Sequence, residues 1–186
     1  MLLEVVESIE KNPGRTGRIA VRLNQKQLNS LNAKQPIYID FTDDKMFGAN
    51  KKDIRIANVE FSNLAVEPID GDFTTATIDL TATHNGKCYI ESQQKNYLFQ
   101  LDQGKGTTIH WTTQYDVIQN MTSDSRASDT DKSILSYILD DNRNQQVFFA
   151  YPGALTQLKV TSHAYGDTEA KLEDATIIIN YEYREF

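Results

Sequence analysis

Two β-rich runs near the end of the chain constrain its fold most. Leu155 to Val160 and Ala175 to Tyr183 are rich in aliphatic, β-branched and aromatic residues, and an acidic loop separates them. Tyr151-Pro152-Gly153 precedes the first run, and a Pro-Gly turn at this place would fix the register of the strands that follow. The pattern predicts an antiparallel strand pair that closes a β-sandwich.

Similar short runs, separated by turn residues, recur upstream and predict roughly nine or ten strands in all. Asn85-Gly86 has the strongest hairpin signal, because this dipeptide suits the positive φ angles of a type I′ turn. The upstream runs are Leu3 to Ile9, Arg18 to Leu23, Ile37 to Phe41, Ile54 to Phe61, Thr74 to Thr83, Tyr97 to Leu101 and Thr107 to Thr112.

Three local patterns refine this expectation. The apolar phase shifts between Ile56 and Val59, which predicts a bulge and a bend in that strand. Gln25 to Leu31 predicts a short helix, whereas Ser133 to Leu139 suits a helix or a strand, and we favour the strand. Thr122 to Ser133 is polar and lacks aromatic residues, so it predicts a long exposed loop.

The fold class predicted is all-β: an antiparallel, jelly-roll-like β-sandwich with long loops and at most one or two short helices. A chain of 186 residues buries one core of good size, so we expect a single domain over 1–186. Within it, 1–36 would supply N-terminal strands or an arm that packs on the sandwich.

Charge and composition exclude several classes of partner. The net charge is −7, which opposes binding to nucleic acid or to an anionic membrane, because both require clustered Lys and Arg. Cys88 is the single cysteine and forms no intramolecular disulfide. The N-terminal run carries acidic residues and no basic leader, which predicts a soluble chain with no signal peptide and no membrane insertion.

The order of segments in the second half carries a family resemblance. A polar loop (Ser123 to Ser133) precedes a run ending in charged residues (Ile134 to Arg143). An aromatic-Pro-Gly-Ala segment then enters a strand (Phe149 to Val160), and an acidic-then-aliphatic strand follows (Glu173 to Tyr181). Asn120 to Phe186 thereby resembles the C-terminal β-sandwich region of the A subunit of bacterial insecticidal Tc (toxin complex) proteins.

Two earlier strands of that region are similar to upstream segments of this chain. These segments are Met46-Phe47-Gly48 leading into Lys51 to Phe61, and Thr74 to Thr83. Leu158 departs from the family, where an aromatic residue is common. The resemblance implies a non-catalytic sandwich that builds a docking or assembly surface in an exported complex. Pore formation is not implied, because the chain has no room for the family's coiled-coil shell and pore-forming helices.

Candidate catalytic and metal-binding residues form no recognisable site. His84, His110 and His163 lack zinc spacing relative to one another and to Cys88, which predicts surface or strand roles for the histidines. Cys88 itself is expected to pack as a small apolar group on a strand. Gly104-Lys105-Gly106 has no upstream glycine and no following helix, so we interpret it as a hairpin turn rather than a phosphate loop.

Acidic clusters raise the question of structural calcium. None has the spacing of an EF-hand loop, so solvated loop charge is the favoured interpretation and no cofactor is predicted. These clusters are Asp40 to Asp44, Asp70 to Asp72, Asp124 to Asp131 and Asp140-Asp141.

The aromatic residues leave two interpretations open. Tyr181 and Tyr183 share one face of their strand, and either pack in the core or form an exposed face that binds a partner protein or a glycan. Three non-enzymatic functions follow: an oligomeric assembly module with protein partners in a toxin complex, a capsid or other virion protein built from a jelly roll, and a carbohydrate-binding sandwich. Each of the first two would place the chain in an extracellular or exported particle.

Overall fold

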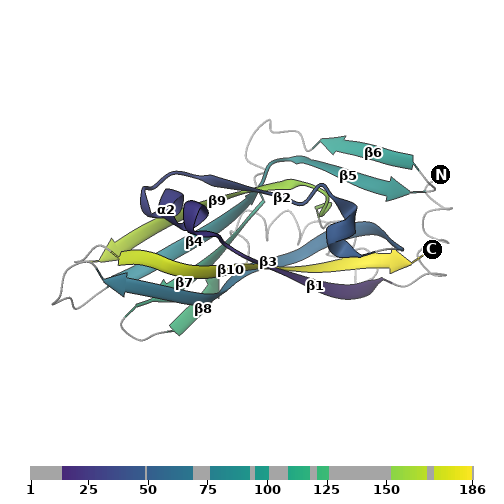
Figure 1. Ribbon diagram of the computed structural model, residues 1–186. Coiled ribbons are helices and arrows are strands. Elements are labelled where there is room, and N and C mark those ends of the chain that lie inside the picture. Colours follow the sequence, from purple (N-terminus) through teal and green to yellow (C-terminus); the bar gives the residue numbers. More distant parts are fainter. Residues whose placement is uncertain are drawn as a thin grey trace.

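In the computed structural model, an antiparallel β-sandwich forms from two sheets with a small hairpin beside them (Figure 1). The structure describes residues 14–48, 50–68, 76–92, 95–100, 109–117, 121–125, 152–166 and 170–185. The elements are β1 (Arg15–Arg22), α2 (Gln25–Asn32), β2 (Ile37–Asp40), the 3₁₀ helix η1 (Asp44–Phe47), β3 (Lys51–Pro68), β4 (Ala76–His84), β5 (Lys87–Ser92), β6 (Lys95–Gln100), β7 (His110–Asp116), β8 (Met121–Ser125), β9 (Gln157–Gly166) and β10 (Ala170–Glu185).

Strand order confirms the predicted all-β, jelly-roll-like class. One sheet has the order β1-β10-β3, the second β2-β9-β4-β7-β8, and the hairpin is β5-β6. Strands β1 to β4 therefore alternate between the two sheets, and β9 and β10 return beside strands from the start of the chain. Non-local pairing of this kind is the arrangement found in jelly rolls.

The predicted closing strand pair is wrong in one respect. Both runs are strands, but β9 pairs with β2 and β4, whereas β10 pairs with β1 and β3. They lie in opposite sheets because each run has a buried face that packs inward against the other sheet. The two runs therefore close both sheets of the sandwich without forming a hairpin.

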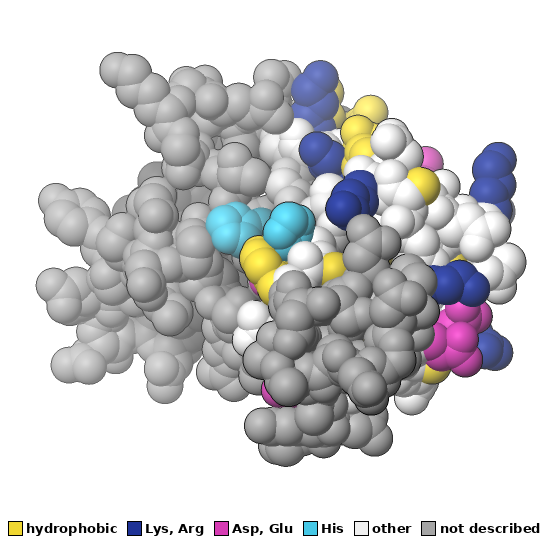
Figure 2. All heavy atoms as spheres, turned by 90° about the vertical axis from the view of Figure 1, so that its left-hand side faces the viewer, with side chains coloured by type: hydrophobic (Ala, Val, Ile, Leu, Met, Phe, Trp, Pro, Cys, Tyr) yellow, Lys and Arg dark blue, Asp and Glu magenta, His cyan; other side chains and the backbone are white. Residues whose placement is uncertain are grey.

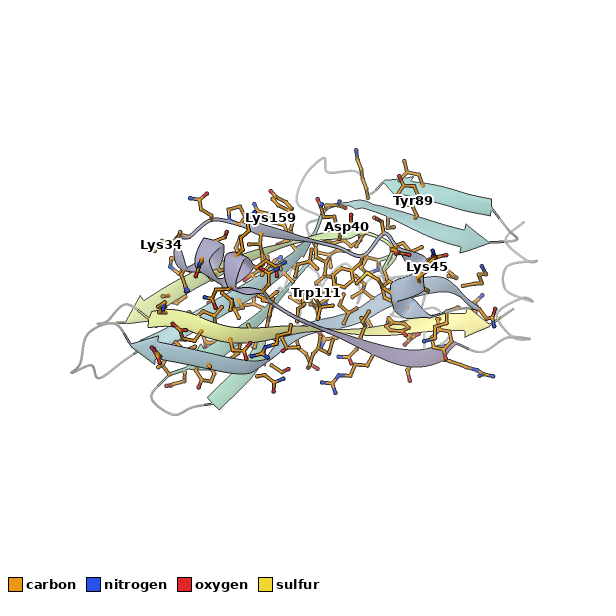
Figure 3. All side chains as sticks on the ribbon, in the orientation of Figure 1. Lys34, Asp40, Lys45, Tyr89, Trp111 and Lys159 are labelled. Carbon is orange, nitrogen blue, oxygen red and sulfur yellow. The ribbon has the colours of Figure 1, made fainter. Side chains whose placement is uncertain are left out.

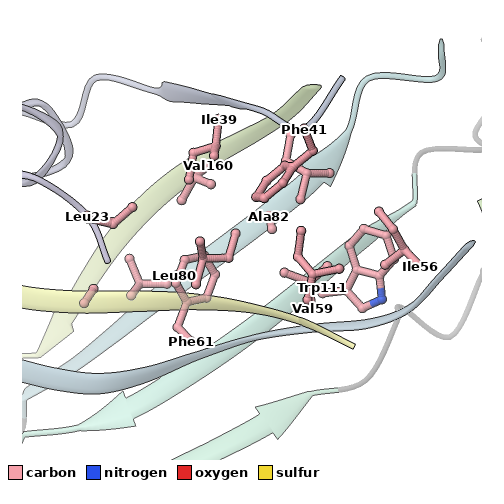
Figure 4. Close-up of a cluster of buried hydrophobic side chains, with 14 of the residues drawn as sticks. Leu23, Ile39, Phe41, Ile56, Val59, Phe61, Leu80, Ala82, Trp111 and Val160 are labelled. Carbon is pink, nitrogen blue, oxygen red and sulfur yellow. The ribbon is translucent and has the colours of Figure 1, made fainter. Parts of the chain in front are cut away.

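The core lies between the two sheets and is built mainly from alternate residues of β2, β3, β4, β7, β9 and β10 (Figure 4). Phe41 and Leu80 are fully buried, and the single tryptophan, Trp111, is 5% exposed. Apolar burial of this extent is the main favourable term in the folding of such a domain.

The predicted bulge in β3 is confirmed. Asn58 lies opposite Asn180 and Ile56 opposite Tyr181, so Ala57 is the extra residue where the register shifts. The shift allows residues on both sides of Ala57 to point inward, and Ile56 and Val59 are both buried.

Helix α2 confirms the helix predicted over Gln25 to Leu31. Asn24 caps it in a capping box with Gln27, since each side chain bonds the other residue's backbone N–H. Leu28 and Leu31 are buried against the sandwich, and Asn32 bonds the backbone N–H and C=O of Leu172 on β10. Among the described residues, no helix is long and apolar enough to cross a membrane.

Two turn and loop predictions need correction. Asn85-Gly86 does not make a hairpin, because β4 pairs with β7 and β9 while β5 pairs with β6. Gly86 does have φ of 80°, and it turns the chain out of the five-stranded sheet toward the β5-β6 hairpin. The first part of the loop predicted over Thr122 to Ser133 is a strand instead, since Met121–Ser125 forms the edge strand β8, and the rest of that prediction lies outside the described residues.

The other described strands overlap the predicted runs, except that β5 was not predicted, and β3 and β9 extend beyond their runs to Pro68 and Gly166. The 3₁₀ helix η1 was not predicted either. Three further predictions lie outside the described residues: the strand Leu3 to Ile9, the Ser133 to Leu139 segment and the turn at Gly104 to Gly106.

Candidate interaction site

Residues 152–156, called the connector here, join three parts of the fold. Pro152 and Ala154 exchange backbone hydrogen bonds with β3, from Ile56 N–H to the Pro152 carbonyl (2.8 Å) and from Ala154 N–H to the Ile54 carbonyl (2.9 Å). At its other end, the Thr156 hydroxyl donates to the Lys87 carbonyl. The connector thus extends the β3 edge toward the β5-β6 hairpin.

This placement changes the role expected for Tyr151, Pro152 and Gly153. Gly153 is buried and forms a β-bridge with Arg55, and positive φ angles among the described glycines occur at Gly48 and Gly86 rather than at Gly153. Pro152 and Gly153 therefore form part of an extended, hydrogen-bonded segment between β3 and β5. Tyr151 lies outside the described residues.

His84 joins the connector to the end of β4 by a hydrogen bond. Its side chain is 4% exposed, and its Nδ1 accepts the Gly86 N–H at 3.0 Å. Nδ1 is therefore unprotonated, so the ring proton lies on Nε2 and is donated to the Gly153 carbonyl at 3.1 Å. Burial lowers the pKa of His84, with the Gly153 hydrogen bond acting in the opposite direction. Both ring nitrogens thus serve a structural purpose, which suits the predicted strand role.

Cys88 confirms the predicted apolar packing on a strand. It lies on β5 with 5% of its surface exposed, and burial raises the pKa of its thiol. A buried thiol that stays protonated is a poor nucleophile. His110 begins β7, and His163 is exposed within β9, which suits the predicted surface or strand roles.

Tyr181 and Tyr183 are not an exposed binding face. They are 3% and 9% exposed and belong to the core, because the inward face of β10 carries them. The Tyr181 ring contacts Phe47 edge to face at 5.1 Å, and Lys51 donates to its hydroxyl at 2.7 Å. The Lys51 ammonium also lies 4.7 Å from the Tyr183 ring centroid, which is a cation–π contact. Core packing is therefore the interpretation that the structure supports.

The acidic segment from Asp40 to Asp44 uses its carboxylates to fix local backbone. Asp40 accepts both the backbone N–H and the hydroxyl of Thr42, and these bonds lower the pKa of the Asp40 carboxyl. Asp43 caps η1 by accepting the Lys45 N–H. No group of three His, Cys, Asp or Glu side chains suited to a metal ion occurs within the described part of the chain. Asp70 to Asp72 and Asp140-Asp141 lie outside that part.

Large apolar side chains are instead exposed on the β5-β6 hairpin. Tyr89 on β5 lies directly opposite Leu98 on β6, and the two are 45% and 56% exposed. Tyr89 projects away from the body of the sandwich (Figure 3). The Tyr89 backbone N–H donates to the Leu155 carbonyl, so the connector holds the strand that presents the ring.

In the sequence, Leu98 lies within the predicted strand Tyr97 to Leu101, whereas Tyr89 lies in no predicted strand. The alternation of Lys87, Tyr89 and Glu91 around Cys88 and Ile90 was a usable signal for β5. It did not show which face of β5 would be buried, because this depends on the connector, which is distant in sequence.

Comparison with protein families, with curated proteins and with solved structures finds no match to this chain.

Proposed function

We propose that this chain is a non-catalytic assembly module that binds another protein through the outer face of the β5-β6 hairpin. The exposed cross-strand pair Tyr89 and Leu98 carries the proposal. Aromatic residues are enriched at the cores of protein interfaces, where a ring covers much area at a small cost in side-chain entropy.

The way in which the hairpin is held supports the same function. A two-stranded hairpin alone is marginally stable in water. Here the Thr156 hydroxyl bonds the Lys87 carbonyl, and the Tyr89 N–H bonds the Leu155 carbonyl. A contact surface fixed before binding loses less conformational entropy when the partner arrives.

The resemblance to the C-terminal sandwich of the Tc toxin A subunit gives the proposal its setting, a docking module in an exported complex. The strand order favours a second candidate, a virion shell protein, because jelly rolls also build viral capsids.

Light scattering on a sizing column separates the two candidates. A monomer or small ring supports the docking module, and a megadalton particle supports the shell protein. Co-expression with the products of neighbouring genes then identifies the protein that co-elutes with this chain.

The double variant Tyr89→Ser, Leu98→Ser is expected to lose that co-eluting protein while keeping its own melting temperature. Tyr38→Ser is the matched control, because Tyr38 is 56% exposed but lies on β2, outside the hairpin. Retention of the partner by the double variant, or its equal loss in the control, would show that the hairpin is not the contact surface.

A further inference from the structure

The outer face of the five-stranded sheet groups an aromatic ring with polar side chains toward one end of its three central strands, β9, β4 and β7. Asp79 on β4 lies opposite His163 on β9 and opposite Gln114 on β7. Tyr165 follows His163 by two residues, so both side chains point to the same face of β9. These four residues, from three adjacent strands, are called the corner cluster.

A hydrogen bond and a ring contact hold the side chains of this corner cluster in place. The Gln114 side-chain amide donates to the Asp79 carboxylate at 3.0 Å. The His163 and Tyr165 rings meet edge to face, with centroids 4.2 Å apart and planes at 69°. Tyr165 nevertheless remains 50% exposed, so its ring is held by a neighbour and still open to solvent. Figure 2, which looks onto this end of the sandwich, shows histidine exposed beside hydrophobic side chains.

We propose that the corner cluster binds a neutral glycan, with the Tyr165 ring under the apolar face of one sugar and the Asp79–Gln114 pair on its hydroxyls. A pyranose presents C–H groups on one face and hydroxyls around its rim. An aromatic ring matches the first, and a carboxylate with an amide supplies both acceptors and a donor for the second.

Strand geometry sets the size of the ligand. Neighbouring strands lie about 5 Å apart, and residues two apart on one strand lie about 7 Å apart. The corner cluster spans three strands and two rows of residues, which matches one or two sugar rings. A single half-exposed ring on a polar face is much smaller than the apolar centre of a protein interface.

The carboxylates in and beside the cluster favour neutral sugars over acidic ones, and the cation on this face of β9, Lys159, lies four residues before His163. Asp79 belongs to the cluster, and Asp116 lies two residues beyond Gln114 on β7, opposite Thr77. These carboxylates repel sialic acid, uronic acid and sulfate groups at short range. Next to the cluster, the hydroxyls of Thr81 and Thr112 bond each other at 2.9 Å, which continues the polar surface along the sheet.

An array of neutral oligosaccharides, together with sialylated and sulfated ones, tests the proposal with the purified chain. We expect binding to neutral glycans, confirmed by calorimetry with the best oligosaccharide. Tyr165→Ala is expected to weaken that binding at least tenfold, and Tyr165→Phe to preserve most of it because the ring is kept. Gln114→Ala is expected to weaken it less than Tyr165→Ala.

Tyr38→Ala is the matched control, since Tyr38 is an equally exposed tyrosine on β2 of the same sheet. All four substitutions replace side chains that are exposed, so melting temperatures are expected to stay within a few degrees of the unmodified chain. The proposal is overturned if no neutral glycan binds, if acidic glycans bind instead, or if Tyr165→Ala and Tyr38→Ala have the same effect. The hairpin of the assembly module is not involved, so either proposal can fail alone.

Discussion

As the pH is lowered, the fold should lose stability through His84 before most of the carboxylates are protonated. Protonation of Nδ1 would place two donors against each other, the new N–H and the Gly86 N–H that now bonds this atom. The neutral form is therefore favoured in the folded state, and the pKa of His84 lies below its value in the unfolded chain.

The sign of the effect follows from proton binding. Below about pH 6.5, the ordinary histidine pKa, the unfolded chain binds a proton at His84 that the folded chain excludes. The free energy of unfolding then falls as the pH is lowered, by up to about 1.4 kcal/mol for each pH unit. The loss continues down to the folded-state pKa of His84 and stops there. Above pH 6.5 this contribution is fully present.

Other groups with shifted pKa values affect the free energy of unfolding in other pH ranges. Hydrogen bonds lower the pKa values of Asp40, with Thr42, and of Asp174, with Arg22, so their stabilisation is lost only below the ordinary carboxyl range. Burial raises the pKa of Glu182, which favours folding on the acid side and opposes the His84 effect.

Urea unfolding followed by the fluorescence of Trp111, the single and buried tryptophan, measures the free energy at each pH. We compare the unmodified chain with His84→Gln between pH 8 and pH 5. The variant is expected to be less stable at pH 8 by about 1–3 kcal/mol, because buried hydrogen-bonding groups lose a partner. It should also lose the extra pH slope below pH 6.5.

His163→Gln is the matched control, because His163 is exposed on β9. It should keep both the stability and the slope of the unmodified chain. Equal slopes in the unmodified chain and in His84→Gln would refute the argument, since the titrating group would then lie elsewhere.

Two further predictions concern packing. Gly17→Ala should destabilise the fold by about 1–3 kcal/mol in urea unfolding, because a Cβ at Gly17 would overlap the Tyr181 ring, which Phe47 holds in place; an unchanged free energy would mean that the ring moves freely. Cys88 should resist alkylation at pH 8 in the folded chain and react rapidly in urea, because it is buried with a raised pKa. Rapid labelling without urea would contradict its placement.

Local sequence patterns predicted most of the described elements of the fold, but not η1, β5 or β8. The capping residue Asn24 and the phase shift before Val59 act through neighbouring residues, so helix α2 and the β3 bulge were both visible in the chain. The pairing partners of the strands could not be predicted from local patterns. Strands β9 and β10 form their hydrogen bonds with strands from the first half of the chain. The Asn85-Gly86 prediction failed for the same reason: Gly86 has the positive φ angle, but Asn85 does not, and the strands that flank the pair find other partners.

Which face of a strand is buried was also beyond local patterns. Alternation placed Tyr181 and Tyr183 on one face of β10 correctly, and the opposite sheet then made it the inner face. The inward position of the Tyr181 ring also depends on Gly17, which lies opposite it on β1. A residue without a side chain leaves room for the ring across the strand pair.

The connector joins the buried side chain of His84 to the strand that carries the exposed Tyr89. Gly153 receives the His84 hydrogen bond, and Leu155, two residues later, accepts the Tyr89 N–H from β5. Protonation of His84 would keep the Nε2–H bond to the Gly153 carbonyl but remove the bond from the Gly86 N–H, which directly precedes β5, and would therefore loosen the strand that carries Tyr89. If the hairpin binds a protein, binding should weaken at acid pH together with the free energy of unfolding, and His84→Gln should remove most of both pH dependences. The buried histidine and the surface pair are thus two ends of one hydrogen-bonded path, although a large distance in sequence separates the connector from both.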